Sequence, residues 1–383
     1  MNIPIIGIYG LSRKETTAGI LPWLANELQL SEGMKNILIL ATGGTIVCSD
    51  RGQGLCPHYT VEELLRCIGP ASPDCKVVGK TVMNIDSSNM TPGRWLAIAE
   101  TVVAEYSHYD GFVVTHGTDT MAYTGAALSY LLQDLNKPVI LTGSQYSMTD
   151  RSTDAIQNLN DSLLVACEDL AGVFIVFDGK VINGSRAIKI KTRSYDAFDS
   201  VNYPLMAEIK HNRIEYNPLL RQVFAKVSKA ADSLPPCVPA LEERLLVVKL
   251  FPGLHPGIFD YIRDNMRGVI IESYGTGGIA TDVMDLAAKI RELTEAGIIV
   301  AITTQCLMEG VDLQVYEVGR KLPLDRIIYA GDMNTEALVP KLMWAMARSR
   351  DFGEIKRLVE TPVRGDLPAA GIDRETSHLS LRQ

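Results

Sequence analysis

The chain has 383 residues, of which 46% are hydrophobic and 21% charged, and its formal net charge is -8 at pH 7. This composition excludes an intrinsically disordered chain, and since a single core stops growing at roughly 250–300 residues, it predicts two domains. An acidic chain without a long Lys/Arg cluster argues against a nucleic-acid or anionic-membrane partner, and no apolar run is long enough to span a bilayer. The composition therefore favours a protein that acts on small molecules over one that binds nucleic acid or membranes.

Cysteine usage and the N-terminal residues indicate a reducing compartment. The seven cysteines are odd in number, are scattered and form no C-x-x-C pair, which argues against a disulfide framework and against a zinc site. No basic residue precedes the apolar residues 1–10, whereas Arg13 and Lys14 follow them, the reverse of the order in a secretory signal. We therefore expect a cytoplasmic protein.

The first half of the chain alternates between strand and helix patterns. Apolar runs and helix-boundary signals predict, in order, strand 37–41, helix 60–68, strand 80–85, helix 92–105, strand 111–115, helix 119–134, strand 138–142, helix 154–168 and strand 171–177. Pro92 suits the first turn of a helix that Thr91 caps, and Pro138 follows the end of another helix. This alternation predicts an α/β fold with a mixed, largely parallel sheet.

The pattern also divides the chain. Residues 1–34 form an N-terminal extension in which Met34 is an alternative start, and the larger N-terminal domain, which carries the candidate chemistry, covers 35–218. A linker at 219–243 loses the strand pattern and contains two adjacent prolines. A smaller α/β (flavodoxin-like) domain at 244–364 is predicted to contain strands 245–250, 268–272, 298–303 and 327–330, with helices 281–296 and 334–349. Thr281 would cap the first of these helices, and a loose polar tail follows at 365–383.

Hydroxyl groups stand where several of the predicted strands end. Thr45 follows strand 37–41 through two glycines, and Thr118 and Asp119 follow strand 111–115. Ligands bind beyond the carboxyl ends of parallel strands, so these residues are predicted to share one crevice. Thr45 is either a nucleophile or a threonine in a tight turn. A phosphate-binding loop is excluded because neither the P-loop lysine nor G-x-G-x-x-G is present.

Charged residues near these turns have competing interpretations. Asp119 is either a reacting carboxylate or a helix cap, and a neutral His116 packed under the turn is favoured over a catalytic base. A threonine nucleophile without a histidine base can use a lysine, and strand alternation places Lys189 and Lys191 on one face. Residues 84–90 gather further hydroxyls at a strand end, although they are also suited to cap a helix.

Two of these stretches, ATGGTI at 41–46 and HGTDTM at 116–121, strongly resemble the two signatures of the bacterial-type L-asparaginase family. The resemblance covers roughly residues 36–350, and its further motifs are IDSSNMTP at 85–92, KPVILTGSQ at 137–145, the Lys189 strand, SVNY at 200–203 and SYGTG at 273–277. The D-S-S-x-M form and the lack of a signal are similar to the cytoplasmic, type I-like branch.

The resemblance implies hydrolysis of the side-chain amide of L-asparagine to L-aspartate and ammonia through a threonine acyl-enzyme, with neither metal nor cofactor. Thr45 matches the nucleophile, while Asp119 and Lys189 match the residues that polarise Thr118. Lys189 is preferred to Lys191 because it lies nine residues before Phe198, the spacing of the family lysine.

Substrate-binding residues also follow from the resemblance. Ser87 and Ser88 match the positions that bind the substrate α-carboxylate, and Asp119, beside Thr118, matches the residue that holds the α-ammonium. Fixing both ends of asparagine disfavours glutamine, whose reacting carbon lies one methylene further away.

One departure from the family pattern concerns the mobile loop after the glycine turn. Related cytoplasmic enzymes carry an activating Tyr where this chain has Leu55, and the candidate replacement is Tyr59. Tyr59 also stands directly before the helix cap Thr60, where an apolar staple residue is expected. Cys48 and Cys56 on this loop suggest sensitivity to oxidation.

Two other functions stay open. The ammonia-releasing subunit of a tRNA-dependent amidotransferase uses the same motifs, although it brings an N-terminal barrel-like domain for which 34 residues are too few. A non-catalytic amino-acid-binding protein would keep the pocket without the chemistry. Family members form homodimers or homotetramers, and the neighbouring subunit's contribution is expected near 274–277 and 304–306.

Overall fold

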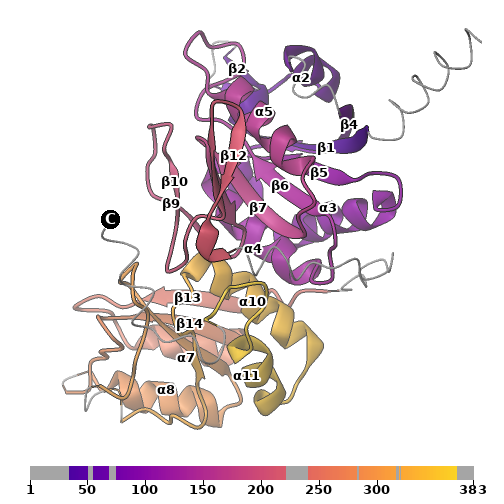
Figure 1. The fold of residues 1–383 in the computed structure, drawn as a ribbon. Helices are drawn as coiled ribbons and strands as arrows, with labels where there is room; N and C mark the ends of the chain where they lie inside the picture. The colour runs from indigo at the N-terminus through magenta and orange to yellow at the C-terminus, as the bar shows by residue number, and fades with distance from the viewer. Residues whose placement is uncertain are drawn as a thin grey trace, which may run out of the picture.

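The structure is a computed structural model that describes residues 34–50, 55–68, 75–220, 240–282, 284–315, 319 and 321–368 (Figure 1). These residues form a large lobe, residues 34–220, and a small lobe, residues 240–368, each built on its own sheet. Of the predicted segments, residues 1–33 of the extension, 221–239 of the linker and 369–383 of the tail lie outside the described residues.

The large lobe contains the predicted mixed, largely parallel sheet, which has eight strands in the order β12-β11-β8-β7-β6-β5-β1-β4. The five strands from β7 to β4 pair in parallel, and the remaining three join by antiparallel pairing. In chain order the strands are β1 (Lys35–Gly43), β4 (Cys75–Ile85), β5 (Gly111–Thr115), β6 (Pro138–Thr142), β7 (Gly172–Phe177), β8 (Lys180–Asn183), β11 (Ala207–Lys210) and β12 (Arg213–Tyr216).

Helices cover both faces of this sheet, which explains why its central strands are continuously apolar. The side chains of β1 alternate between two cores: Leu38 and Leu40 belong to the cluster with α3 and α4, whereas Ile37 and Ile39 belong to the cluster with α2 and α5. The four helices are α2 (Val61–Cys67), α3 (Pro92–Glu105), α4 (Met121–Leu131) and α5 (Ala155–Ala166).

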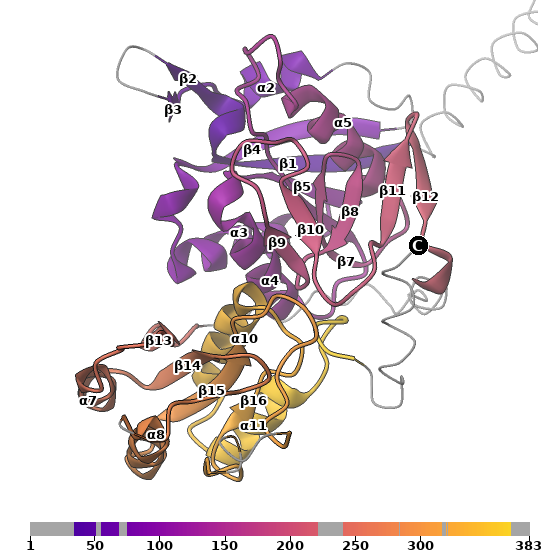
Figure 2. The same ribbon diagram turned by 90° about the vertical axis from the view of Figure 1, so that its left-hand side faces the viewer.

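The small lobe is the predicted smaller α/β unit, with four parallel strands in the order β13-β14-β15-β16. The strands are β13 (Leu245–Lys249), β14 (Gly268–Ser273), β15 (Ile299–Thr304) and β16 (Ile328–Tyr329). Helices α7 (Gly257–Asn265) and α8 (Leu286–Glu295) share one apolar cluster with the sheet, while α10 (Thr335–Arg348) and α11 (Phe352–Glu360) lie on the other side. Figure 2 shows α10 between the two sheets, where its apolar residues join the cluster around α4.

Several predicted boundaries were wrong. The helix expected from Thr281 begins at Leu286, because Asp285 accepts a hydrogen bond from the Ala288 N–H and the buried apolar residues start only at Leu286. The helix expected from Asp119 begins at Met121, after a 3-10 turn, η3 (Thr118–Thr120). Helices α7 and α11 were not predicted, although α11 has a regular cap at Asp351.

The segment after α11 returns to the large lobe, where Gly365 and Asp366 make contacts that connect the two lobes. Lys341 of α10 and Asp366 are both fully buried, with 2.6 Å between Nζ and Oδ2, and the Tyr130 hydroxyl of α4 donates to the same oxygen at 3.0 Å. Arg186 Nε donates to the Gly365 carbonyl at 2.8 Å. The domain end at 364 stays a prediction, but Asp366 itself is part of the packed interior and not of a loose tail.

His116 directly follows β5 and, like the Lys341–Asp366 pair, is fully buried. Its Nδ1 lies 2.7 Å from the Gly117 carbonyl, so Nδ1 carries the proton, and its Nε2 accepts from the Thr124 hydroxyl at 2.9 Å. Trp95 Nε1 donates to the same hydroxyl at 3.0 Å. Burial lowers the pKa of His116 to about 4, so the ring is neutral at pH 7. This matches the packed histidine that the sequence favoured over a catalytic base.

Removing one partner of the buried ion pair should destabilise the fold. Lys341→Met leaves the Asp366 carboxylate buried without its cation, and we expect the free energy of unfolding to fall by about 3–5 kcal/mol in urea titrations. The double variant Lys341→Met/Asp366→Leu removes both charges and should recover much of this loss. The exposed pair of Lys210 and Glu208 gives the control, because water screens this pair and Lys210→Met should change the stability far less. Equal losses for the two single lysine variants would show that burial of the Lys341–Asp366 pair does not decide its contribution to stability.

His116 should make stability depend on pH in the acid range. The pKa of His116 is lower in the folded state than the roughly 6.5 of an unfolded histidine, so the unfolded chain binds a proton first as the pH falls. The contribution of neutral His116 to the free energy of unfolding is therefore complete above pH 6.5. It is lost progressively as the pH falls towards 4, by up to about 3 kcal/mol.

The non-titrating variant His116→Gln isolates this effect. It should be less stable at pH 7 but lose less additional stability between pH 6.5 and pH 4 than the unmodified protein, as measured by urea unfolding across that range. Parallel pH profiles for the two proteins would show that His116 is not the titrating group.

Candidate active site

The candidate residues lie at the carboxyl ends of neighbouring parallel strands. Thr45 follows β1, Ser87 and Ser88 follow β4, and Thr118 and Asp119 follow β5. In the strand order β4 and β5 flank β1 on opposite sides, so the chain changes direction across the sheet between β1 and β5 (Figure 1). Such a switch point is where parallel sheets open a crevice for ligands.

Two glycines allow the turn after β1 to enter this crevice. Gly43 and Gly44 have φ values of 106° and 85°, which side-chain-bearing residues rarely adopt. A Cβ at Gly43 would lie 2.3 Å from the Ile85 carbonyl oxygen, and one at Gly44 would lie 2.4 Å from the Gly117 nitrogen. Because no side chain intervenes, the 3-10 turn η1 (Thr45–Val47) lies directly against the turn after β5, with Thr45 half-buried.

The end of β4 forms the adjoining wall. Asp86 Oδ1 accepts from the Ser88 N–H at 2.8 Å and from the Ser88 hydroxyl at 2.6 Å, and these two bonds lower the pKa of Asp86. Ser87 is buried, its carbonyl accepts from the Thr120 hydroxyl at 2.8 Å, and a Cβ at Gly117 would lie 2.5 Å from its Oγ. The three turns after β1, β4 and β5 therefore meet.

A lysine from a distant hairpin completes the group. Strand β9 (Ala187–Lys189) pairs with β10 (Phe198–Ser200), and Lys189 lies opposite Phe198. Lys189 Nζ donates to Thr118 Oγ1 at 2.7 Å and to Asp119 Oδ1 at 2.6 Å. The lysine side chain is 17% exposed and the Asp119 side chain 67%. Lys191 instead forms an ion pair with Asp196.

Gln145 is a further residue at this site that the sequence analysis did not single out. The Thr118 hydroxyl faces Gln145 Oε1 at 3.5 Å, while Gln145 Nε2 donates to the Ser194 carbonyl in the β9–β10 hairpin at 3.0 Å. The carboxylate of Asp154, which is 8% exposed, accepts from the backbone N–H groups of Gln145 and Tyr146. Two signals in the sequence could have found Gln145: it ends the family motif at 137–145, and it follows the apolar strand 138–142.

The loop after Thr45 is a β-hairpin, and Tyr59 stands at its base. Strands β2 (Cys48–Asp50) and β3 (Leu55–Pro57) pair antiparallel, with Leu55 opposite Asp50, and Figure 2 shows the hairpin projecting from the lobe. The Tyr59 N–H donates to the Val47 carbonyl at 3.0 Å, and the ring packs against the apolar cluster beside α2. Thr60 forms the capping box of α2, so Tyr59 occupies the staple position expected of it.

The small-lobe turns named in the sequence analysis follow β14 and β15. The Thr304 hydroxyl donates to the Gly275 carbonyl, and the Ser273 hydroxyl donates to the Thr303 carbonyl at 2.6 Å. Within the part of the chain that the structure describes, these groups bond to one another. That arrangement is typical of core strand ends, and the expected contribution to a neighbouring subunit stays a prediction.

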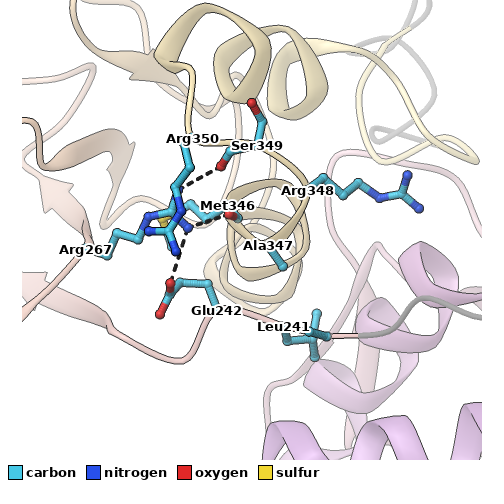
Figure 3. Close-up of a pocket in the computed structure, with 9 residues that line it drawn as sticks. Leu241, Glu242, Arg267, Met346, Ala347, Arg348, Ser349 and Arg350 are labelled. Carbon is cyan, nitrogen blue, oxygen red and sulfur yellow. Dashed lines mark hydrogen bonds and ion pairs between the residues drawn. The ribbon is translucent and has the colours of Figure 1, made fainter.

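A separate cavity of about 310 Å³ lies at the end of α10, away from these groups (Figure 3). Its central cation is Arg267, which donates to Glu242 at 3.2 Å and to the Ser349 carbonyl at 2.7 Å. The Arg244 and Arg267 guanidinium groups lower the pKa of Glu242 to about 2. Arg348 and Arg350 also line the cavity, which lies between Glu242 just before β13 and the end of α10, apart from the hydroxyl-bearing turns of the large lobe.

Metal ligands and membrane-spanning helices are the remaining features that could point to another function. No group of three or more His, Cys, Asp or Glu side chains that could hold a metal ion occurs among the described residues. In the same ranges, every helix is too short or too polar to cross a bilayer. The expectation that the protein needs no cofactor stays a prediction.

Comparison with known proteins identifies the family. The model "Asparaginase, N-terminal" matches residues 36–221, and "Glutaminase/Asparaginase C-terminal domain" matches residues 244–359. An L-asparaginase of Thermococcus kodakarensis is 34% identical over 332 residues, which are 86% of this chain and 98% of that protein. A glutamyl-tRNA(Gln) amidotransferase subunit of Pyrococcus horikoshii is 36% identical over 346 residues, 87% of this chain and 77% of that protein.

The fold agrees with the sequence matches. The structure of the thermostable L-asparaginase from Thermococcus kodakarensis aligns with a TM-score of 0.80 at 32% identity, and the alignment covers 88% of this chain and 100% of that chain. The resemblance inferred from the strand-end motifs is thus confirmed over both lobes, and the chain belongs to the asparaginase family.

Proposed function

We propose that the protein hydrolyses the side-chain amide of L-asparagine to L-aspartate and ammonia. The observation that carries this proposal is the position of Lys189 Nζ, which bonds to both Thr118 Oγ1 and Asp119 Oδ1 at the turn that Gly44 and Thr45 approach. The carboxyl edge of the sheet therefore carries two threonine hydroxyls, a lysine and a carboxylate. Acyl transfer without a histidine base can use these groups as nucleophile and base.

The proposed reaction passes through an ester of Thr45. Its Oγ attacks the side-chain carbonyl carbon, the hydroxyl proton passes to the departing nitrogen, and ammonia leaves. Water then attacks the ester, which releases aspartate and restores the Thr45 hydroxyl. In this scheme Lys189 and Asp119 polarise Thr118, so that its hydroxyl can take up and return a proton. An unactivated amide also needs a fixed approach, which adds several kcal/mol to catalysis.

Substrate recognition is proposed for both ends of asparagine. Asp119 uses Oδ1 for Lys189, so its exposed side chain can offer Oδ2 to the α-ammonium. Ser87 and Ser88 are assigned to the α-carboxylate. Fixing both ends places the reacting carbon of glutamine one methylene out of position, which is worth roughly 10 to 200-fold in specificity.

A second candidate is the ammonia-supplying subunit of a tRNA-dependent amidotransferase. The identity to the Pyrococcus horikoshii amidotransferase protein, 36%, is as high as the 34% to the Thermococcus kodakarensis L-asparaginase. The asparaginase is favoured because the alignment spans 98% of that enzyme and 77% of the amidotransferase protein. Loss of the family tyrosine at Leu55 would fit the third possibility, a binding protein without turnover.

Assembly and location complete the proposal. We propose a homodimer or homotetramer that acts on L-asparagine in the cytoplasm, with neither nucleic acid nor membrane as a partner. The net charge of -8 supports the exclusion of nucleic acid.

The deciding experiment measures ammonia release by the purified full chain from L-asparagine and, separately, from L-glutamine. We expect fast release from asparagine and slow release from glutamine, with no added metal. Thr45→Ala and Thr118→Val should each lower kcat by about a thousandfold or more while the protein stays folded. Thr101→Val, which removes a hydroxyl bonded within α3, is the matched control and should keep turnover.

Other results would favour the alternatives. If the folded protein released ammonia from neither substrate, the partner-dependent subunit or a binding protein would be favoured. Aspartate binding in calorimetry without turnover would select the binding protein. Full activity of the Thr45→Ala variant would exclude the proposed nucleophile.

Tyr59→Phe tests the proposed replacement for the family tyrosine. If the Tyr59 hydroxyl activates Thr45, kcat should fall by orders of magnitude while the melting temperature is unchanged, because the ring still fills the staple position. Tyr261→Phe, at a surface tyrosine that is 50% exposed, controls for the loss of a phenol. An unchanged rate would remove Tyr59 from the chemistry and leave it as a packing residue.

A further inference from the structure

Two cysteines meet at the edge of the large sheet opposite the candidate active site. Cys75 is the first residue of β4, and Cys167 directly follows α5. Both are half-buried, carry free thiols and pack against the apolar cluster that includes α2 and α5. Segments far apart in the sequence thus bring two thiols to the amino ends of the parallel strands.

Several contacts place the two thiols together. The Cys75 and Cys167 side chains pack against the same apolar cluster, and the neighbouring Cys75 thiol contributes to the raised pKa of Cys167. Lys35 lies opposite Cys75 in the β1–β4 ladder, and its Nζ forms an ion pair at 2.8 Å with Asp169, two residues beyond Cys167. A Cβ at Gly111 would lie 2.3 Å from the Ala166 carbonyl, so the end of α5 is pressed against the start of β5. The start of β4 and the end of α5 therefore lie beside one another.

We infer that Cys75 and Cys167 form a dithiol site that closes into a reversible disulfide when a small-molecule disulfide or a peroxide is present. The remaining cysteines whose side chains are described do not offer such a pair. The Cys48 thiol donates to the Gly44 carbonyl at 3.2 Å, and Cys306 is exposed in the small lobe.

Oxidised glutathione supplies a balanced route to the disulfide. The Cys75 thiolate attacks one glutathione sulfur, which forms a mixed disulfide and releases one glutathione thiolate. Cys167 then gives up its proton and attacks the Cys75 sulfur, which releases the second glutathione. Two electrons pass from the protein thiols to the glutathione disulfide. Burial and the neighbouring Cys75 raise the pKa of Cys167 to about 12, so Cys75 is assigned the first attack and the closure is slow.

The disulfide should change stability and leave the active site undisturbed. It closes a long loop that contains α3, β5, α4, β6 and α5, which restricts the unfolded chain, and we expect Tm to rise by about 5–10 °C. Strand β4 has 11 residues, so its two ends lie roughly 33 Å apart. The inference does not depend on the proposed function, because its measurements do not use turnover.

The test uses the reduced full chain with and without oxidised glutathione. Thiols that remain free are alkylated, and the protein is then weighed and digested. Compared with the reduced and alkylated protein, we expect the oxidised protein to carry two fewer alkyl groups and to have lost two further hydrogens. We also expect a peptide that links Cys75 to Cys167 and the higher Tm, and dithiothreitol should reverse all of these changes. Phenylarsine oxide, which bridges paired thiols, should protect both cysteines of the reduced protein from alkylation, so the pairing can be examined without a variant.

Matched variants complete the experiment. Cys75→Ser and Cys167→Ser should each abolish the linked peptide and the rise in Tm, whereas Cys306→Ser should keep both. The inference is overturned if glutathione stays attached to a single cysteine, if the disulfide links other residues, or if Cys167→Ser shows the same rise in Tm.

Discussion

The close approach of the backbone at Gly44 and Gly117 is the constraint on which the candidate site depends. A Cβ at Gly44 would lie 2.4 Å from the Gly117 nitrogen, and one at Gly117 would lie 2.5 Å from Ser87 Oγ. Neighbouring parallel strands lie about 4.8 Å apart, so side chains after their ends would normally separate the turns that follow. Glycine at both positions removes that separation. The hydroxyl-bearing turns after β1, β4 and β5 can then lie against one another, as the proposed reaction requires.

The rest of the site is brought in by a hairpin that belongs to none of these strands. The β9–β10 hairpin places Lys189 beside Thr118, and Phe198 opposite it is buried against Phe177, with ring centroids 5.0 Å apart. Gln145 ties the hairpin tip to the same site through Ser194, and Asp154 holds the Gln145 backbone. A lysine on a flexible stem is thereby held at two oxygens, and in the proposed reaction this would reduce the rearrangement needed before a proton moves.

The sequence predicted those parts of the fold and the site that depend on local patterns. Strands β5 and β6, helix α3 and the strand-end positions of Thr45, Thr118 and Asp119 follow from apolar runs ended by polar turns. The contact of Lys189 with Thr118 did not follow from alternation, which gave Lys191 the same face; only the family spacing distinguished them. The ion pair of Asp366 could not be predicted, because its partner is distant in the chain and an isolated Asp carries no periodic signal. Gln145 ends the family motif at 137–145, but its contacts with Thr118 and Ser194 did not follow from that motif.

The departure at Leu55 limits how Thr45 can be activated in the proposed chemistry. Leucine has no proton to exchange, so a hydroxyl elsewhere must serve, and Tyr59 is the tyrosine nearest to Thr45 along the chain. Its backbone is bonded to Val47, the last residue of the 3-10 turn that begins at Thr45, so the two residues are held on the same short unit. The ring, however, packs beside α2. The staple that stabilises the start of α2 and the hydroxyl that would serve Thr45 therefore belong to one side chain, and both roles are compatible only if the ring stays packed while its oxygen faces the turn.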